Sequence, residues 1–321
     1  MDRSKIEWTD ATWNPVTGCT KVSQGCKNCY AERQWPRLST GRPFTEVRCH
    51  ADRLDIPLHW RVRKPRRVFV NSMSDLFHED VLDDFIAAVF HRMALAPWHV
   101  YQILTKRPQR MLNFMHTFSS PPQHVWLGVS VEDQATADKR IPLLLQTPAA
   151  VRFISAEPLL GPVDLGRYMS RAQYNEWAYA GGPDECPHGY AAGIPCPLCP
   201  HLNWIICGGE SGPRARPMHP DWARSLRDQC HAAAVPFFFK QWGEYAPACA
   251  QYPGTDAEHD ETESHSCYGD ICISNDAYIW EDGVQPSVNG RPWLMDRVGK
   301  KKAGRLLDGV MHDEYPERGI E

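Results

Sequence analysis

Three cysteines near the start of the chain have the type and spacing of a metal or cluster site. Cys19, Cys26 and Cys29 follow a C-x6-C-x2-C pattern. Three thiolates on one loop suit a cubane iron–sulfur cluster with one iron left open, because such clusters are normally bound by cysteine thiolates. An open iron can chelate the amino and carboxylate groups of a small molecule. Gly18 and Gly25 each precede a cysteine, which allows the loop to wrap closely around a cluster.

The same cysteines also fit a structural zinc site. Zinc is bound tetrahedrally by four cysteine or histidine side chains, and Cys49 or His50 could supply the fourth ligand. Spacing alone therefore leaves both interpretations open.

A second set of ligand residues occurs in the segment DECPHGYAAGIPCPLCPH. Its spacing is C-x-H-x7-C-x2-C, and its members are Cys186, His188, Cys196 and Cys199. Four such ligands fill a tetrahedral zinc site and leave no open position, so the pattern favours a small structural zinc knuckle. A loop with free thiols is the alternative. We hypothesise that a zinc knuckle beside an active site would grip a nucleic acid or a partner protein.

Regular elements must position these groups, and six short apolar runs predict the strands that do so. Each run opens with β-branched or aromatic residues and ends in polar residues or glycine, as in strands buried on both faces of a parallel sheet. The stretches between runs, such as 82–93 and 221–234, have helical periodicity. The alternation predicts an α/β fold with a partial or complete (β/α) barrel, and a doubly wound open sheet is the competing layout. The runs are 67–75, 99–107, 125–133, 151–159, 204–212 and 236–244.

Two regions interrupt this alternation. An insertion separates the fifth and sixth runs, and the last part of the chain loses periodicity and gains Gly, Asp, Asn and Pro. We therefore predict a barrel over residues 1–245, a zinc-knuckle-like insertion over 162–203 and a C-terminal extension over 246–321.

Polar side chains and glycines gather where the predicted strands end. In parallel α/β folds, chemistry collects at the carboxyl ends of the strands, so we expect these residues to line a shared pocket. The glycines would let backbone approach a ligand, and a glutamate there could bind ribose hydroxyls. The residues are Ser72, Ser74, Asp75, Ser130, Glu132, Glu157, Gly208, Gly209, Glu210 and Lys240.

Composition narrows the class of protein. The chain has 321 residues and 12 cysteines, with neither an apolar signal region nor a stretch long enough to span a membrane. We expect a soluble, cytoplasmic protein, in which closely spaced cysteines are more often metal ligands or redox groups than disulfides. The net charge of -4 gives no global basic field toward nucleic acid. Basic runs at 61–67, 106–110 and 299–305 are interpreted as solvated faces, which permit such binding without indicating it.

Longer motifs resemble known proteins. The segment NPVTGCTKVSQGCKNCYAER is similar to the cysteine segment of radical S-adenosylmethionine proteins related to spore photoproduct lyase. It departs from their usual C-x3-C-x2-C spacing by three extra residues. The segments VFVNSMSDLFHEDV, YQILTKRPQRM, FISAEPLLGPV and WIICGGESGPRARPM resemble the phage Gp37/Gp68 family, a domain of unknown function, over nearly the whole chain. The resemblance implies a (β/α) barrel of the radical S-adenosylmethionine type.

The resemblance also implies roles at matching positions. Cys19, Cys26 and Cys29 would bind a 4Fe-4S cluster, and Tyr30 lies where these proteins usually place an aromatic side chain near the adenine. The residues expected near the methionine amino group of S-adenosylmethionine are Ser72, Ser74 and Asp75. Those expected near its ribose or carboxylate are Ser130 and Glu132.

The implied function is a radical S-adenosylmethionine enzyme that generates a 5'-deoxyadenosyl radical, with repair or modification of a nucleic-acid base as the expected reaction. Its partners would be a flavodoxin- or ferredoxin-like electron donor, and a nucleic acid or a nucleic-acid-modifying protein. The alternative is a non-catalytic, zinc-bearing protein that binds nucleic acid or a partner.

Overall fold

The computed structural model describes most of the predicted barrel and part of the C-terminal extension. The described residues are 4–39, 41–60, 63–118, 120–169, 201–248, 271–273, 279–280 and 293–317. The predicted zinc ligands Cys186, His188, Cys196 and Cys199 lie outside them. Within the described ranges, no helix combines the length and apolar character needed to cross a membrane.

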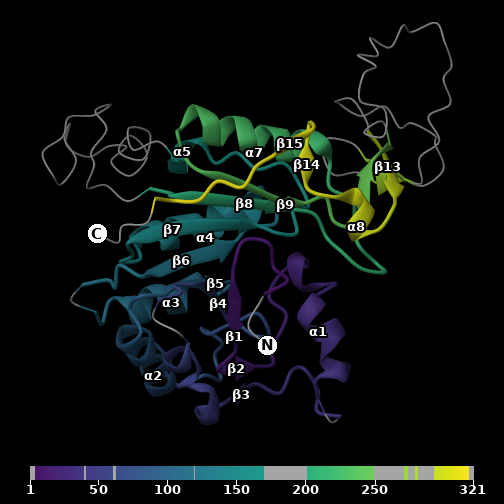
Figure 1. Cartoon of the computed structure of the whole chain (residues 1–321). Coiled ribbons are helices and arrows are strands. Elements are labelled where there is room, and N and C mark those ends of the chain that lie inside the picture. Colours follow the sequence, from purple (N-terminus) through teal and green to yellow (C-terminus); the bar gives the residue numbers. More distant parts are fainter. Residues whose placement is uncertain are drawn as a thin grey trace, which may run out of the picture.

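A seven-stranded sheet forms the body of the molecule (Figure 1). Every neighbouring pair of strands is parallel, and the spatial order follows the sequence. The strands β2 and β3 pair with each other outside this sheet. The six predicted runs all contain strands of this sheet, which confirms the α/β prediction. The strands, in spatial order, are β1 (Ala11–Trp13), β4 (Arg67–Val70), β5 (Val100–Thr105), β6 (Val125–Ser130), β7 (Val151–Ala156), β8 (Trp204–Gly208) and β9 (Phe237–Gln241).

The sheet is a partial barrel. β1 and β9 are its two edges, so the seven strands do not close into a ring. A doubly wound sheet would reverse its strand order at a switch point. Within the described residues, this sheet has no such reversal and its helices pack on one face, so the competing layout is excluded.

In the part of the chain that the structure describes, four main helices cover the outer face of the sheet. Their apolar stripes join alternate strand residues such as Val68, Ile103 and Ile154 in one large core. Figure 1 shows α7 over β8 and β9, and α2 near the opposite end of the sheet. The predicted helical stretches 82–93 and 221–234 correspond to α2 and α7. The helices are α2 (Asp83–Leu95), α3 (Pro108–Met115), α4 (Gln134–Gln146) and α7 (Pro220–Ala232), with the short α5 (Gly166–Met169) before the insertion.

The inner face of the sheet changes character along the strands. Near the amino ends, Trp8 packs on Phe69 with ring centroids 4.7 Å apart and on Trp204 at 6.2 Å. Phe153 can lie across this face because Gly128 has no side chain. A Cβ at Gly128 would come within 2.6 Å of the Phe153 ring. The aromatic layer closes one end of the partial barrel, so ligand access is left to the polar carboxyl ends.

Short elements surround the carboxyl ends of the strands. In the N-terminal part they are β2 (Val16–Thr17), η1 (Gln24–Cys26), α1 (Tyr30–Gln34), η2 (Trp35–Arg37), β3 (Arg48–Cys49), η3 (Ala51–Arg53) and η4 (Ile56–His59). In the C-terminal part, an antiparallel sheet contains β10 (Tyr245–Pro247), β11 (Ile271–Ile273), β12 (Ile279–Trp280) and β13 (Trp293–Arg297).

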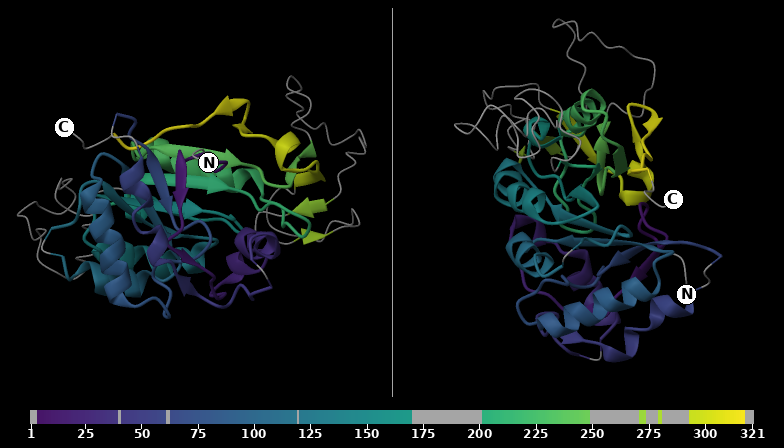
Figure 2. Two further views of the ribbon diagram at one scale, coloured as in Figure 1. Left: turned by 60° about the horizontal axis from the view of Figure 1, so that its bottom comes forward. Right: turned by 90° about the vertical axis from the view of Figure 1, so that its left-hand side faces the viewer.

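The end of the chain returns along β9. After α8 (Lys300–Ala303) and the hairpin of β14 (Leu306–Leu307) and β15 (Val310–Met311), the backbone reaches the edge of the main sheet. There Phe239 donates its N–H to the carbonyl of His312 at 2.9 Å, and Phe238 bridges antiparallel to Asp313. Figure 2 shows this yellow segment running beside the green strands.

A candidate cluster site at the carboxyl ends of the strands

The loop that carries the three cysteines begins with a turn fixed by glycine. Gly18 has φ of +89°, and a Cβ there would lie 2.3 Å from the carbonyl oxygen of Glu46. Its N–H donates to Met73 at 3.1 Å, so the loop starts against the segment after β4. Cys19 follows directly, Cys26 ends η1 and Cys29 is the N-cap residue of α1. All three thiols are partly exposed.

Two carboxylates at strand ends hold this loop in place. Ser23 donates to Glu132 after β6 at 2.9 Å. Asn28 donates to Glu210 after β8 at 3.0 Å. The cysteine loop therefore spans the carboxyl edge of the sheet, from β4 to β8.

Glu132 is fully buried and charge-compensated. Lys106 Nζ lies 3.1 Å from one carboxylate oxygen and Arg140 Nη1 lies 2.9 Å from the other. Burial alone would raise the pKa of this carboxyl, but the two cations and Ser23 bring its pKa below the ordinary value. A Cβ at Gly25 would lie 2.5 Å from the Glu132 side chain. The glycine before Cys26 is therefore needed for close approach to Glu132.

Glu210 is compensated in the same way. Arg216 makes a bidentate pair with it, with Nε 2.9 Å from Oε2 and Nη2 2.7 Å from Oε1. Burial raises the pKa of Glu210, and the bonds from Arg216 and Asn28 more than offset this, so the pKa is lowered. Arg216 also donates to the carbonyl of Gln24 at 3.1 Å.

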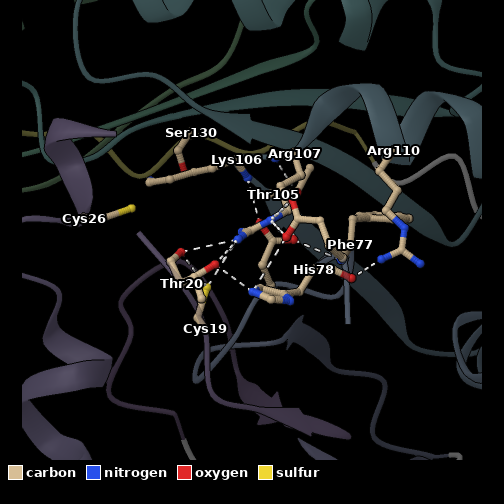
Figure 3. A network of polar contacts seen from close by, with 12 residues as sticks. Cys19, Thr20, Cys26, Phe77, His78, Thr105, Lys106, Arg107, Arg110 and Ser130 are labelled. Carbon is tan, nitrogen blue, oxygen red and sulfur yellow. Dashed lines mark hydrogen bonds and ion pairs between the residues drawn. The ribbon is translucent and has the colours of Figure 1, made fainter. Parts of the chain in front are cut away.

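A third network joins Cys19 to the strand ends (Figure 3). The buried Asp75 carboxylate accepts from Thr105 Oγ1 at 2.7 Å and from Arg107 Nη1 at 3.2 Å. The same Arg107 nitrogen lies 3.8 Å from Cys19 Sγ, and Arg107 Nη2 donates to Thr20 Oγ1 at 2.9 Å. Arg107 is thus a buried guanidinium that links a carboxylate to the first cysteine.

The surroundings of Cys19 favour its neutral thiol in the absence of a bound metal. Burial, followed by the Asp75 charge, raises the pKa of Cys19 to about 11, against the opposing effect of Arg107. A thiol must lose its proton to bind iron or zinc. Metal binding at Cys19 therefore releases a proton at neutral pH.

Several predicted pocket residues support the loops. Tyr30 donates its hydroxyl to the carbonyl of Ser72 at 2.6 Å, and Ser72 Oγ donates to Asn14 at 3.1 Å. Ser74 Oγ donates to the carbonyl of Val16 at 2.9 Å. In these positions the hydroxyls tie the cysteine loop and β2 to the end of β4.

The remaining predicted residues lie on the inner face or at the end of β8. Ser130 is buried at the end of β6. Glu157 pairs with Lys240 at 2.9 Å, which bridges the ends of β7 and β9. A Cβ at Gly208 would lie 2.6 Å from Glu157 Oε1, and one at Gly209 would lie 1.8 Å from a backbone oxygen. Both glycines are therefore required by packing within the chain.

Sequence reasoning missed the residues that hold the cysteine loop. Arg107 belongs to the basic run 106–110, which was predicted to be a solvated face; this is wrong for Arg107, which is only 8% exposed. The signal that could have found it is its position directly after Thr105 and Lys106 at a strand end. Ser23 and Asn28 carried no such signal, because their partners are more than 100 residues away.

Several strands of the sheet carry buried polar atoms without partners. Among the described residues, Asn71 Nδ2, Gln102 Oε1 and Gln241 Oε1 have no hydrogen-bond partner. Asn71 and Gln241 lie at the carboxyl ends of β4 and β9, whereas Gln102 lies in the middle of β5, in register with Phe69 and Trp126. Buried polar groups are nearly always satisfied in proteins, so a polar ligand or water is expected beside these atoms.

Comparison with known proteins identifies the family. The chain belongs to DUF5131, a family of proteins of unknown function, whose match spans residues 3–316. This is the phage Gp37/Gp68 family, so the family resemblance is confirmed. A search of curated proteins finds no match. Among solved structures, the fold is distantly similar to a mutant of spore photoproduct lyase, at 12% identity and a TM-score of 0.43, covering 72% of this chain and 75% of that chain.

Proposed function

We propose that this protein is a radical S-adenosylmethionine enzyme in which Cys19, Cys26 and Cys29 hold a 4Fe-4S cluster. The observation that carries the proposal is the loop itself, whose three cysteines are fastened across the carboxyl ends of a parallel partial barrel. Chemistry gathers at that end of parallel α/β folds. Three protein thiolates leave one iron free for a substrate.

The donor set fits a cluster better than a single zinc ion. Tetrahedral zinc with Zn–S bonds of about 2.3 Å brings its sulfurs to roughly 3.8 Å from one another. Among the described residues, the Sγ atoms of the three cysteines do not all lie within 4.8 Å of one another. Of the fourth ligands considered, Cys49 is exposed on β3 and His50 Nε2 is engaged with Thr17 at 2.8 Å.

The chain's own residues orient the site and exclude water. When bound, the cluster would supply the electron that cleaves S-adenosylmethionine to methionine and a 5'-deoxyadenosyl radical. Arg107 would donate a hydrogen bond to the Cys19 sulfur, and Glu132 and Glu210 would fix the rest of the loop. The aromatic layer around Trp8 would close the far end of the barrel, which protects a radical from solvent.

We assign the S-adenosylmethionine site to the inner face beside the cysteine loop. Asn71 Nδ2, which follows β4 and is buried without a partner among the described residues, offers a hydrogen-bond donor. Ser130 ends β6 and Glu157 directly follows β7, where Lys240 holds it in place. A carboxylate fixed in this way is suited to accept hydrogen bonds from ribose hydroxyls.

Anaerobic reconstitution with iron and sulfide tests the cluster. We expect about four iron and four sulfide per chain, the composition of a cubane cluster. Cys26→Ala should lose this cluster, whereas Cys49→Ala, which removes an exposed cysteine outside the loop, should keep it. With S-adenosylmethionine and dithionite, the wild type should release 5'-deoxyadenosine.

The metal content and the release of 5'-deoxyadenosine distinguish a radical enzyme from a structural zinc protein. Zinc at both cysteine sets after strictly anaerobic purification would overturn the cluster and favour a structural zinc protein. A cluster without 5'-deoxyadenosine would overturn the radical reaction alone. Reduction by a flavodoxin- or ferredoxin-like protein in place of dithionite would identify the class of electron donor.

Three exposed arginines beside the loop support a nucleic-acid substrate. Arg33 donates to the carbonyl of Ser211 at 2.8 Å and Arg297 donates to that of Pro213 at 2.6 Å. Arg214 lies in the same turn, and all three arginines are exposed. We propose that this turn contacts the phosphates of a nucleic acid whose base enters the barrel.

Salt-dependent binding of a fluorescent oligonucleotide tests this substrate class. Replacing Arg33, Arg214 and Arg297 together by Gln should weaken binding and reduce the slope of log K against log salt by up to about three. The control Lys139→Gln lies on the outer helix α4 and should leave the slope unchanged. Equal affinities for the triple variant and the wild type would overturn the proposal.

A further inference from the structure

Two histidines and a glutamate meet beside β9, away from the cysteine loop. One ligand atom from each of His231, His312 and Glu314 can be chosen so that all lie within 4.8 Å of one another. His231 lies in the last turn of α7, and the other two belong to the segment that returns along β9. Because this segment pairs with the first three residues of β9, the group lies near the amino end of that strand.

Backbone pairing fixes the two ligands of the C-terminal segment on one side. Phe239 donates to the His312 carbonyl at 2.9 Å and Glu314 donates to the Phe237 carbonyl at 3.3 Å. Residues two apart in an extended segment project to the same face. His312 and Glu314 therefore both face α7, where His231 completes the group.

The polar atoms of the group have the pattern of a ligand site. His312 is only 8% exposed, and its Nε2 is buried without a hydrogen-bond partner among the described residues. One carboxylate oxygen of Glu314 accepts from the Phe237 N–H at 3.0 Å. That bond orients the carboxylate as outer-shell partners orient metal ligands and leaves the second oxygen available.

Arg227, which acts electrostatically on His312, does not compete for the group. Arg227 lies one turn before His231 on α7, and its guanidinium pairs with Asp308 at 2.6 Å and with Asp228 at 2.8 Å. The glutamate is therefore not claimed by this arginine.

We propose that His231, His312 and Glu314 bind a divalent first-row transition ion such as Zn²⁺, which fastens the C-terminal segment to α7 and β9. Two imidazoles and one carboxylate are a recurrent donor set for such ions, with water filling the remaining position. The site lies away from the cysteine loop and does not depend on the function proposed for that loop. Its role is to hold the end of the chain against the barrel.

Counting Co²⁺ ions on the full-length, metal-free protein under anaerobic conditions tests the site. Co²⁺ bound by thiolates shows strong sulfur-to-cobalt charge-transfer absorption, which a histidine–carboxylate site lacks. Relative to the wild type, His231→Ala should bind one ion fewer at micromolar Co²⁺, with the charge-transfer band unchanged. Loss of a ligand should weaken this one site by about 100-fold or more, since even outer-shell changes cost 10–100-fold.

Two further variants keep the test independent of misfolding. Glu314→Gln retains an acceptor for the Phe237 N–H and should weaken the same site, whereas His91→Ala, on the exposed side of α2, should bind as the wild type does. Zn²⁺ should slow tryptic cleavage after Arg305 in the wild type and in His91→Ala, but not in the two ligand variants. Equal ion counts in all four proteins, or loss of the charge-transfer band with the ion, would overturn the proposal.

Discussion

Cys19 must lose its proton before its sulfur can bind a metal or a cluster. Burial and the Asp75 charge raise its pKa from 9.0 to about 11. Asp75→Asn removes that charge while keeping the side-chain shape, so we expect the pKa of Cys19 to fall. Site-resolved alkylation of the metal-free protein, followed by mass spectrometry over a pH series, measures it. The midpoint for Cys19 should move to lower pH in Asp75→Asn and stay in place in the exposed control Asp80→Asn.

The same shift has a defined consequence for stability. The folded state favours the neutral thiol, so this contribution is fully present below pH 9.0 and is lost as the pH rises through about 11. An alkylation midpoint for Cys19 that is equal in Asp75→Asn and the wild type would contradict the role given to Asp75.

Arg107 is expected to tune a bound cluster. Its guanidinium lies 3.8 Å from the Cys19 sulfur, and hydrogen bonds to sulfur are among the factors that set cluster potentials. A cationic donor stabilises the reduced, more negative state, so Arg107→Gln should lower the midpoint potential of the reconstituted protein. EPR-monitored redox titration measures it, with Arg92→Gln on α2 as the control. An equal or higher potential in Arg107→Gln would contradict the prediction.

Single residues were predictable from sequence only where local spacing carries the signal. Type and spacing predict Cys19, Cys26 and Cys29 as ligands, which stays a prediction, and strand ends point to Glu132 and Glu210 as site residues. The sequence could not show that these carboxylates serve as anchors for the loop. That role depends on contacts with Ser23 and Asn28 across the folded sheet.

Among the elements, α4 begins with a complete capping box directly after Glu132. The Asp133 side chain accepts from the N–H of Thr136 at 2.8 Å, and Thr136 Oγ1 accepts from the N–H of Asp133 at 3.0 Å. Asp133→Ala should therefore reduce the free energy of unfolding by about 1 kcal/mol. Urea denaturation measures the change. Asp133→Ser preserves a capping oxygen and should lose much less, and an equal loss in both variants would show that capping is not the cause.

Strands and outer helices were predictable because each carries its own periodicity. The runs that became β4 to β9 are apolar on both faces, and the stripe of α2 repeats every three or four residues. The return of the C-terminal segment beside β9 has no comparable local pattern. Its pairing joins Phe239 to His312, 73 residues later, and depends on the hairpin geometry before it.

On the scale of the whole molecule, buried carboxylates connect the cysteine loop, the sheet and the outer helices. Glu132 alone contacts Ser23 of the loop, Lys106 after β5 and Arg140 of α4. Breaking a buried pair by removing one partner typically costs about 3–5 kcal/mol, because the remaining charge is left uncompensated. Glu132→Gln should thus be destabilised by about this amount at neutral pH, and Glu317→Gln at an exposed site should not.

Acid should remove the same contribution from the wild type. The pKa of Glu132 and that of Glu210 are both lowered from 4.5 in the folded protein, so their contribution is present above pH 4.5 and is lost as the pH falls through the folded values. Urea denaturation at neutral pH and at progressively lower pH should therefore show the gap between wild type and Glu132→Gln narrowing once the pH drops below 4.5. A gap that stays constant into strong acid would mean that the lost packing of the carboxylate, and not its charge, joins the loop to the barrel.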